Sequence, residues 1–389
     1  MSPASPFAAD FLTRDWCLLL EACSLPRSST KISALAVEIR DPESLLRLAE
    51  EHGVIAHIAA ALASVSDANI SAALLDSLRT RRRSQLLSTL TMTAELFRVL
   101  DLLSQSGIES LVIKGPVLAL RAYGDPAARQ YGDIDAVVRH ADIARAAKIL
   151  VAAGYESRIP AEAIREGKIP GQYLFRRPST DVIFELHTER TFRYYPRPFP
   201  IERYFQDKTS LTLDGHVVPA LSAEQECVLI SIHGAKHFWE RLMWISDIAA
   251  MVYNHPELDW KGVRQSAADV GAERMVRLAL LLAERLLGVP APEEMRKEMA
   301  LDTVNLQLVQ EIESWLPYAG HAAPTIARRA MFRFRMRGSP LAGARYLTRL
   351  SLATTEEDWS AGVDARSRIA EILRRPFRLA KKHRRDPDT

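Results

Sequence analysis

The pattern of apolar and polar positions divides the chain into stretches of different structure. Up to about residue 106, apolar residues recur at spacings of three and four, most continuously over residues 72–103. This is the spacing of a buried helix face, so the first stretch is predicted to be helical. The same spacing returns after about residue 216, where Ser222 and Gln225 form a capping box before an apolar run. Further helices are predicted over residues 262–270, 274–287 and 304–315.

Between residues 107 and 215 the pattern changes to short apolar runs separated by Gly, Pro and Asp. Such runs are typical of strands, and the order strand, helix, strand, helix, hairpin indicates a small mixed sheet. The chain is therefore predicted to be α+β and mostly helical, with a mixed-sheet core flanked by N- and C-terminal helical regions. The predicted strands are residues 110–114, 133–138, 173–176 and 182–187, of which the last two form a hairpin.

These changes predict four parts along the chain. Residues 1–106 form an N-terminal helical region, 107–215 the α/β core and 216–373 a C-terminal helical domain. Residues 374–389 form a basic tail, with seven Lys or Arg residues between Arg374 and Arg385. Such a tail is either a solvated terminus or a weak contact with an anionic membrane surface or acidic partner, where each cation contributes about 1 kcal/mol.

Two acidic residues begin the second predicted strand, in the sequence Gly132-Asp133-Ile134-Asp135. Side chains two residues apart on a strand point to one face, which places Asp133 and Asp135 together with their Cα atoms about 6–7 Å apart. Paired carboxylates suit Mg²⁺, which is usually held by one or two carboxylates and substrate phosphates. The motif therefore predicts a divalent-metal site for phosphoryl chemistry.

A third carboxylate is expected from the strand over residues 182–187. Glu185 on that strand would complete a three-acid cluster for two metal ions about 3.5–4 Å apart. Asp181 lies on the same face of the strand and is the alternative. His187 has three candidate roles: to orient Glu185, to donate to substrate, or to sit satisfied within the sheet.

These motifs resemble those of the uncharacterised nucleotidyltransferase family of the polymerase-β superfamily. The resemblance extends from about residue 40 to the end, and its strong motifs lie between residues 111 and 187. It implies a polymerase-β-like core, an NTP donor and Mg²⁺, two ions in all. The residues that carry it are Leu111-Val112-Ile113-Lys114-Gly115, Tyr123, Arg129, Gly132-Asp133-Ile134-Asp135 and, further on, His233-Gly234-Ala235-Lys236-His237-Phe238-Trp239-Glu240-Arg241-Leu242.

One motif departs from the superfamily pattern, because Lys114-Gly115-Pro116 stands where the usual loop has Gly followed by Gly or Ser. Lys114 ends an apolar strand and is predicted to contact a nucleotide phosphate. Gly115 would let the phosphates approach the following helix N-terminus. Arg129 would bind the triphosphate or form a structural ion pair. The predicted catalytic and metal-binding residues are Asp133, Asp135 and Glu185.

A second group of polar residues lies in the helix predicted to begin near Ala223. His233 and His237 are one turn apart and share a face. This resembles a zinc-protease pattern, but Gly234 stands where that pattern needs its glutamate. We expect a polar helix face lining the nucleotide cleft, with Asp247 as a general base or, alternatively, a buried ion-pair partner. The predicted acceptor-side contacts are His187, His233, Lys236, His237, Arg241 and Asp247, the last five along one helix.

Composition narrows the class of protein. The chain has 389 residues, of which 48% are hydrophobic and 25% charged, as in ordinary globular proteins. A net charge of +3 and the lack of an aromatic-and-basic stacking pattern argue against nucleic-acid binding. No apolar run predicts a transmembrane helix, and no signal peptide is evident. Three scattered cysteines make no disulfide framework, so a cytoplasmic protein is expected.

The leading hypothesis is a metal-dependent nucleotidyltransferase that moves an NMP group from an NTP to a hydroxyl or phosphate acceptor with pyrophosphate release. The resemblance suggests a sugar, phosphosugar or peptide acceptor. One alternative is a non-catalytic regulatory module, antitoxin-like, that binds a nucleotide or a protein partner. Another is transfer of a different phosphate-linked group by the same metals.

Overall fold

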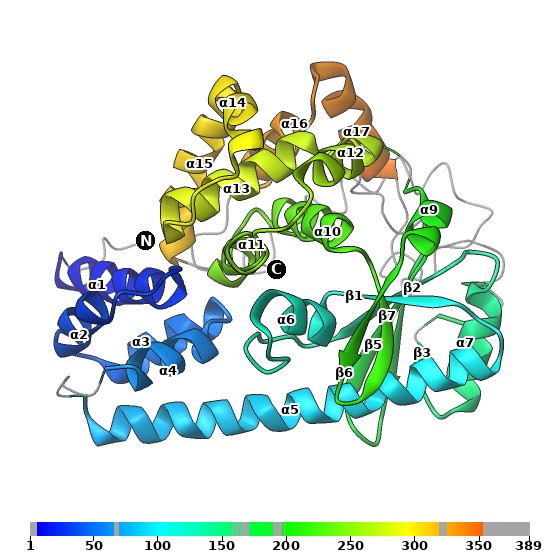
Figure 1. Ribbon diagram of the computed structural model, residues 1–389, viewed down its shortest axis with the longest axis horizontal. Coiled ribbons are helices and arrows are strands. Elements are labelled where there is room, and N and C mark those ends of the chain that lie inside the picture. The colour runs from blue at the N-terminus through cyan, green and yellow to red at the C-terminus, as the bar shows by residue number, and fades with distance from the viewer. Residues whose placement is uncertain are drawn as a thin grey trace.

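The computed structural model describes residues 6–65, 70–157, 159–160, 163–164, 171–189, 197, 199–318 and 325–352. This part of the chain is mostly helical with one mixed sheet of seven strands, which confirms the predicted α+β class. Figure 1 shows the short N-terminal helices on the left of the view, the sheet on the right and the C-terminal helices above. Among these residues, no helix combines the length and apolar character needed to cross a membrane. The basic tail lies outside the described residues.

The N-terminal region consists of short helices followed by a long one. They are α1 Pro6–Cys23, α2 Ser29–Val37, α3 Pro42–Glu51, α4 Ile55–Ala63 and α5 Ala72–Gln105. Side chains of Ser28, Asp41 and Ser71 accept hydrogen bonds from first-turn amides of α2, α3 and α5, which satisfies donors that have no partner inside the helix. The long helix α5 runs along the lower edge of the view, from the short helices to the sheet (Figure 1).

The sheet combines antiparallel and parallel pairs in the order β3-β4-β5-β2-β1-β7-β6. β1 and β2 are antiparallel, β2 and β5 are parallel, and β4 and β5 form the predicted hairpin. The end of β1, the start of β2 and the middle of β5 therefore lie together. The strands are β1 Ser110–Ile113, β2 Ile134–Val138, β3 Glu156–Ser157, β4 Gln172–Arg177, β5 Val182–His187, β6 Thr209–Leu213 and β7 His216–Ala220.

The two faces of β2 have different surroundings, because alternate side chains of a strand point to opposite faces. Ile134, Ala136 and Val138 belong to an apolar cluster shared with α5 and with α7 (Ile143–Ala152). Val137 belongs instead to the large cluster that includes the C-terminal helices. Asp135 lies on the same face as Val137, so the sheet turns this carboxylate toward the C-terminal helices and away from α5.

The helices that follow β7 cover that second face of the sheet. β6 and β7 were not predicted, and β7 continues the sheet to Ala220, beyond the predicted core boundary at residue 215. The first helix after β7 begins at the predicted capping box of Ser222 and Gln225. Helix α6 (Gly115–Tyr123), which follows β1, packs against α11 (Leu242–Asn254). A short α9 (Ile201–Gln206) precedes β6. The C-terminal helices are α10 Ala223–Lys236, α11 Leu242–Asn254, α12 Trp260–Val270, α13 Glu273–Leu287, α14 Glu293–Leu301, α15 Thr303–Trp315, η1 Leu316–Tyr318, α16 Ile326–Arg335 and α17 Pro340–Leu352.

One predicted element is wrong, because the helix that begins at Ala223 does not continue through Arg241 and Asp247. α10 ends at Lys236, and α11 starts at Leu242. Between them Phe238 and Trp239 have φ angles of 57° and 54°, a left-handed conformation that stops an α-helix. Trp239 folds back onto α10, and a Cβ added at Gly234 would lie 2.4 Å from its ring. The turn therefore depends on the absence of a side chain at Gly234.

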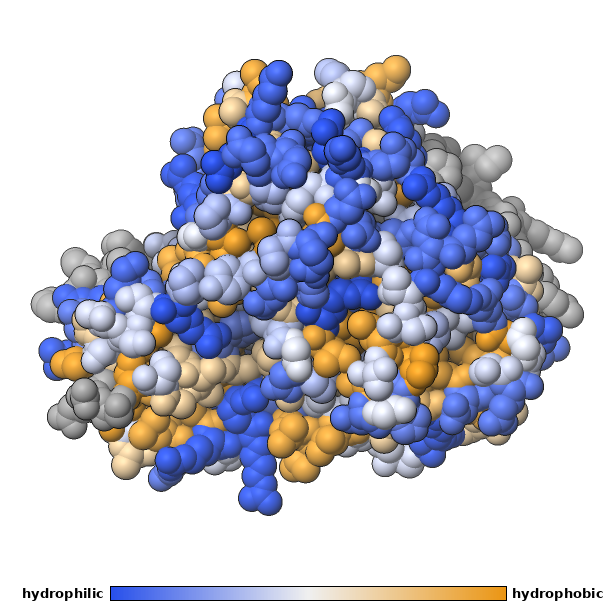
Figure 2. Space-filling model, in the orientation of Figure 1, coloured by the Kyte–Doolittle hydropathy of each residue, from blue (hydrophilic) through white to orange (hydrophobic). Residues whose placement is uncertain are grey.

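Apolar side chains are not evenly distributed over the surface. Figure 2 shows mostly hydrophilic side chains over the C-terminal helices and more apolar ones in the lower half of the same view. On α5, Leu86, Leu87 and Leu90 are each about half exposed. Single exposed apolar residues are normal on a folded protein.

Candidate active site

The predicted acidic residues gather where three strands meet. Ile113 at the end of β1 is paired with Asp135, and Asp135 is in turn paired with Glu185 of β5. Lys114 directly follows β1, and Asp133 directly precedes β2. Strand pairing alone therefore places an ammonium group and three carboxylates at one edge of the sheet.

Lys114 has an unusual backbone conformation. Its φ is 61° and its ψ is −149°, which lies in a region that residues other than glycine rarely occupy and that stores about 1–3 kcal/mol of strain. Gly115 follows with a φ of 53°, where glycine has no steric penalty. This pair of residues turns the chain from β1 into α6 within two positions.

Both oxygens of the Asp135 carboxylate are bonded to nitrogen atoms. The Nζ of Lys114 lies 2.9 Å from Oδ2, and the Nε2 of His187 lies 2.7 Å from Oδ1. Burial alone would raise the pKa of Asp135, but Lys114 and His187 outweigh it and hold this pKa below its usual value. Burial alone would lower the pKa of Lys114 and His187, and the carboxylate of Asp135 outweighs it and raises both. Asp135 is therefore held as an anion.

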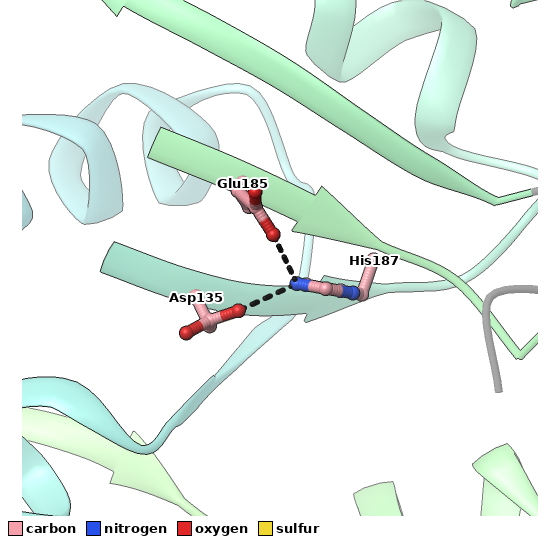
Figure 3. A group of neighbouring side chains, drawn as sticks. All are labelled: Asp135, Glu185 and His187. Atoms are coloured by element: carbon pink, nitrogen blue, oxygen red, sulfur yellow. Dashed lines mark hydrogen bonds and ion pairs between the residues drawn. The ribbon is translucent and has the colours of Figure 1, made fainter. Parts of the chain in front are cut away.

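Glu185 lies beside Asp135, and one imidazole joins the two (Figure 3). Its Oε2 accepts a hydrogen bond of 2.6 Å from Nε2 of Gln172 and lies 3.4 Å from Nε2 of His187. Burial alone would raise the pKa of Glu185, but His187 outweighs it and lowers the pKa. The alternative acid, Asp181, is exposed at the hairpin turn and pairs with Arg176, so it lies apart from this group.

Asp133 has a different environment from Asp135. Within the described part of the chain, its carboxylate has no hydrogen bond or ion pair. Burial and then the neighbouring charge of Asp135 raise the pKa of Asp133 to about 6, although Lys114 partly opposes this. A partly buried carboxylate without a counter-ion is electrostatically unfavourable, and a bound cation would relieve it.

The donor set fits a hard divalent ion. Ligand atoms of Asp135, Glu185 and His187 lie within 4.8 Å of one another, and Asp133 adds the carboxylate without a counter-ion. Carboxylate oxygens are the ligands that Mg²⁺ prefers, and imidazole suits transition metals better. The residues that could hold the ion are therefore the three predicted acids, with His187 positioned to orient two of them.

The site opens into a cavity of about 690 Å³, within the range of small-ligand sites. One wall comes from the turn after β1 and the connector before β2, another from α10, α11 and the turn between them, and the end of α3 also contributes. The cavity is lined by Glu51, Gly53, Lys114, Gly115, Arg129, Gln130, Tyr131, Gly132, Asp133, Asp135, His233, His237, Glu240, Arg241, Met243 and Trp244.

The helical wall of the cavity is aromatic. The His233 and His237 rings have centroids 4.7 Å apart and lie 5.5 and 5.2 Å from the ring of Trp244. Burial, then the nearby charge of Lys236, lowers the pKa of His237 to about 3, and burial followed by Lys114 lowers the pKa of His233 well below its usual value. Both imidazoles are therefore neutral near pH 7, and this wall offers uncharged ring faces.

Arg129 joins the cavity to the C-terminal helices. Its Nε donates to both carboxylate oxygens of Asp247, at 2.8 and 3.0 Å, and the hydroxyl of Tyr123 donates to the same carboxylate at 3.0 Å. Burial outweighs these partners and raises the pKa of Asp247. Of the two roles predicted for Arg129, the ion pair is visible in the structure, and its guanidinium also borders the cavity.

Several predicted contacts lie outside the cavity lining. Glu185 and His187 lie beside Asp135, and Asp247 lies behind Arg129. Lys236 borders a separate small hollow with Arg333 and Arg337. Of the acceptor-side residues predicted from the helical domain, the cavity brings together His233, His237 and Arg241.

Some residues of the site were missed by the sequence analysis. Gln172 bonds to Glu185 across the hairpin, and its place one residue before the predicted strand was the available signal. Glu240 lies within the motif that follows His233, borders the cavity and pairs with Arg329 at 3.2 Å. Glu51, the last residue of α3, also lines the cavity, and no local pattern marks it.

Comparison with known proteins identifies the family of this chain. A family model described as uncharacterised nucleotidyltransferase matches residues 38–288, which contain every residue that lines the cavity. The chain belongs to this family. Membership of the uncharacterised nucleotidyltransferase family, together with the α+β core, supports nucleotidyl transfer and an NTP substrate.

Two other comparisons add little to the family assignment. No curated protein matches the chain. Among solved structures, an antigenic nucleotidyltransferase-like protein from Paracoccidioides brasiliensis is 17% identical, with 51% of this chain and 93% of that one covered and a TM-score of 0.31. A likeness of this strength carries no argument about the nucleotidyltransferase site.

Proposed function

We propose that this protein transfers an NMP group from an NTP to a hydroxyl or phosphate acceptor and releases pyrophosphate. The observation that supports this most is one wall of the cavity, where Lys114, Gly115, Asp133 and Asp135 lie together. A positively charged side chain, a free helix N-terminus and paired carboxylates are the groups that a metal-bound triphosphate needs.

Each residue has a role in this proposal. Asp133, Asp135 and Glu185 would hold the divalent ions, proposed as two Mg²⁺. Such ions, when bound, neutralise the triphosphate and favour the attacking oxygen in its ionised form. Lys114 and the amide of Gly115 would orient the phosphates. Catalysis would then come mainly from positioning and charge stabilisation.

The helical wall would contact the uncharged part of a ligand. His233, His237 and Trp244 would offer ring faces to a nucleoside or to the acceptor, and Arg241 and Glu240 line the same cavity. Closely packed rings would also exclude water from the transferred phosphate. A sugar, phosphosugar or peptide acceptor remains our prediction, as does a cytoplasmic location. Nucleic acid is not proposed as a ligand.

The experiment that tests this function is isothermal titration of the purified protein with each of the four NTPs, with and without Mg²⁺. We expect Mg²⁺-dependent binding of at least one NTP, and loss of that binding in the Asp133→Ala/Asp135→Ala variant. Acceptors would then be screened by pyrophosphate release in the presence of that NTP.

The outcomes separate the alternatives. If an NTP binds but no tested acceptor leads to pyrophosphate release, a non-catalytic regulatory module would be favoured. Transfer from another phosphate-linked donor without pyrophosphate release would favour the alternative in which the same metals transfer a different phosphate-linked group. Normal turnover by the doubly substituted variant would show that the carboxylates are not the catalytic ones.

A further inference from the structure

The bonds made by Asp135 place a nitrogen atom against each of its carboxylate oxygens, so a metal ion could bind either oxygen only beside one of these nitrogens. Oδ2 lies 2.9 Å from the ammonium of Lys114, and Oδ1 lies 2.7 Å from the imidazole of His187. A divalent ion bound to either oxygen would stand within a few ångströms of one of these groups. Like charges repel strongly at such separations in a partly buried site. Movement of one of the two nitrogens would therefore favour ligation of the ion by Asp135.

The surroundings of the two nitrogens indicate which one moves. His187 lies on β5, contacts both Asp135 and Glu185, and has a ring fixed within the sheet. Lys114 lies after the end of β1 and borders the cavity. Its ammonium is carried on a four-carbon stem with several rotatable bonds. Lys114 is thus the group that can leave without disturbing the sheet.

The backbone at Lys114 gives a second, independent indication. Its φ of 61° and ψ of −149° would suit glycine, and a lysine here stores about 1–3 kcal/mol of strain. Strain of this kind persists where the surrounding structure holds it and commonly marks a functional residue. The same turn places Lys114 beside the first amides of α6, where a helix N-terminus favours anions.

We propose that Lys114 is an exchangeable counter-ion, which neutralises Asp135 in the empty cavity and passes to the triphosphate when the donor binds. The exchange frees Oδ2 of Asp135 for the divalent ion. Metal and triphosphate would then bind with positive coupling, since each favours the arrangement that the other needs. This inference rests on the proposed function, because it takes a triphosphate as the ligand.

The test measures the two ligands separately on the full-length protein. Mn²⁺ alone is titrated and free Mn²⁺ is followed by electron paramagnetic resonance; inorganic tripolyphosphate is titrated calorimetrically with EDTA present. Lys114→Met should bind Mn²⁺ about tenfold tighter, because a competing cation has gone, and tripolyphosphate about tenfold weaker, because a phosphate contact has gone. A lysine with only a structural role would not move the two affinities in opposite directions.

Arg241→Met is the matched control, because it removes the same charge from the same cavity without touching Asp135. We expect it to change Mn²⁺ affinity less than about threefold. Lys114→Gly is the second variant, since glycine relieves the backbone strain and keeps the fold if Lys114→Met does not. It should show the same gain in Mn²⁺ affinity.

The proposal is overturned if both Lys114 variants bind Mn²⁺ no tighter than the wild type, or if Arg241→Met gains as much. Its failure is distinguishable from failure of the proposed function. Mg²⁺-dependent NTP binding in the wild type without a gain in Mn²⁺ affinity would reject the exchange and leave the transferase intact. No NTP binding, together with the gain in Mn²⁺ affinity, would reject the transferase and leave Lys114 as a side chain that competes with a metal ion for Asp135.

Discussion

The sheet edge at Asp135 and the junction of α6 with α11 each contain a buried carboxylate paired with a cation at the same cavity. At the junction, Asp247 is bonded through both oxygens to Arg129 and also to Tyr123. At the sheet edge, Lys114 makes its ion pair from a strained backbone. A planar guanidinium held by several bonds fixes two elements together, whereas an ammonium on a flexible stem can exchange partners. The Arg129–Asp247 pair is thus expected to maintain the shape of the cavity, whereas the Lys114–Asp135 pair is expected to be available to a ligand.

The largest expected effect comes from removing the charge at the sheet edge. Asp135→Asn should lower the rate of NMP transfer by about 10³-fold or more, because the divalent ions lose a carboxylate ligand and no longer hold the triphosphate in place. The measurement is pyrophosphate release at saturating NTP. Near-normal release by a correctly folded Asp135→Asn protein would contradict the site assignment. Arg241→Met, which removes a charge that lines the same cavity, should keep a much larger share of the activity.

Breaking the junction pair should act on folding more than on chemistry. Arg129→Met leaves Asp247 buried without its cation, and removal of one partner of a buried pair lowers the free energy of unfolding by about 3–5 kcal/mol. Denaturant unfolding measures this loss. Arg129→Met/Asp247→Leu should regain most of it. If the single variant were fully stable but unable to bind NTP, Arg129 would instead be a triphosphate ligand.

Asp133 should behave in the opposite way to Asp135 in the metal-free protein. Its folded-state pKa of about 6 is above the usual 3.8, so between these values the folded state binds more protons than the unfolded one. The free energy of unfolding should therefore fall as pH rises from about 4 to about 6. Asp133→Asn should remove this dependence and stabilise the metal-free protein near pH 7 while abolishing metal-dependent NTP binding.

Thermal unfolding across pH, with EDTA present, checks this prediction. An Asp133→Asn protein less stable than the wild type at pH 7 would mean that the carboxylate has a partner in the folded state. The matched variant Asp135→Asn should lose stability at the same pH, because Lys114 and His187 would be left without their anion.

The smallest effect is expected at the aromatic wall. Trp244→Ala should weaken binding of the nucleotide or acceptor by a few-fold to about tenfold, since ring contacts contribute about 0.5–1.5 kcal/mol. Trp244→Phe, which keeps a ring, should recover most of the affinity. Titration calorimetry measures both. Equal losses in the two variants would point to the indole N–H and away from the ring face.

Local sequence was sufficient to place the acids because their separation depends on strand geometry. Asp135 and Glu185 become neighbours through parallel pairing of β2 with β5, and alternation puts both on the face that lacks α5. The choice between Glu185 and Asp181 needed the hairpin register. The two residues are four positions apart, so alternation alone puts them on the same face, and only the register shows that Asp181 lies in the turn. Whether these residues carry out catalysis is a prediction that the variants above test.

Other features depend on contacts that no local pattern contains. Arg129 and Asp247 lie 118 positions apart in the sequence, and nothing near either residue indicates its partner. The break between α10 and α11 has no Gly or Pro within it; Phe238 and Trp239 adopt left-handed angles because the tryptophan packs against Gly234. Tertiary packing overrides helix periodicity there, and it turns Glu240 and Arg241 toward the cavity.

The long helix α5 limits where the chain can be divided. Its 34 residues span about 50 Å. On its second half, Met92, Leu96, Val99 and Leu103 belong to the apolar cluster that covers one face of the sheet. A protein shortened to begin at residue 107, where the sequence changes texture, would expose that apolar face to water and would aggregate. The smallest part of the chain that includes the sheet and folds alone should therefore contain α5, and a shortened protein should begin before residue 72.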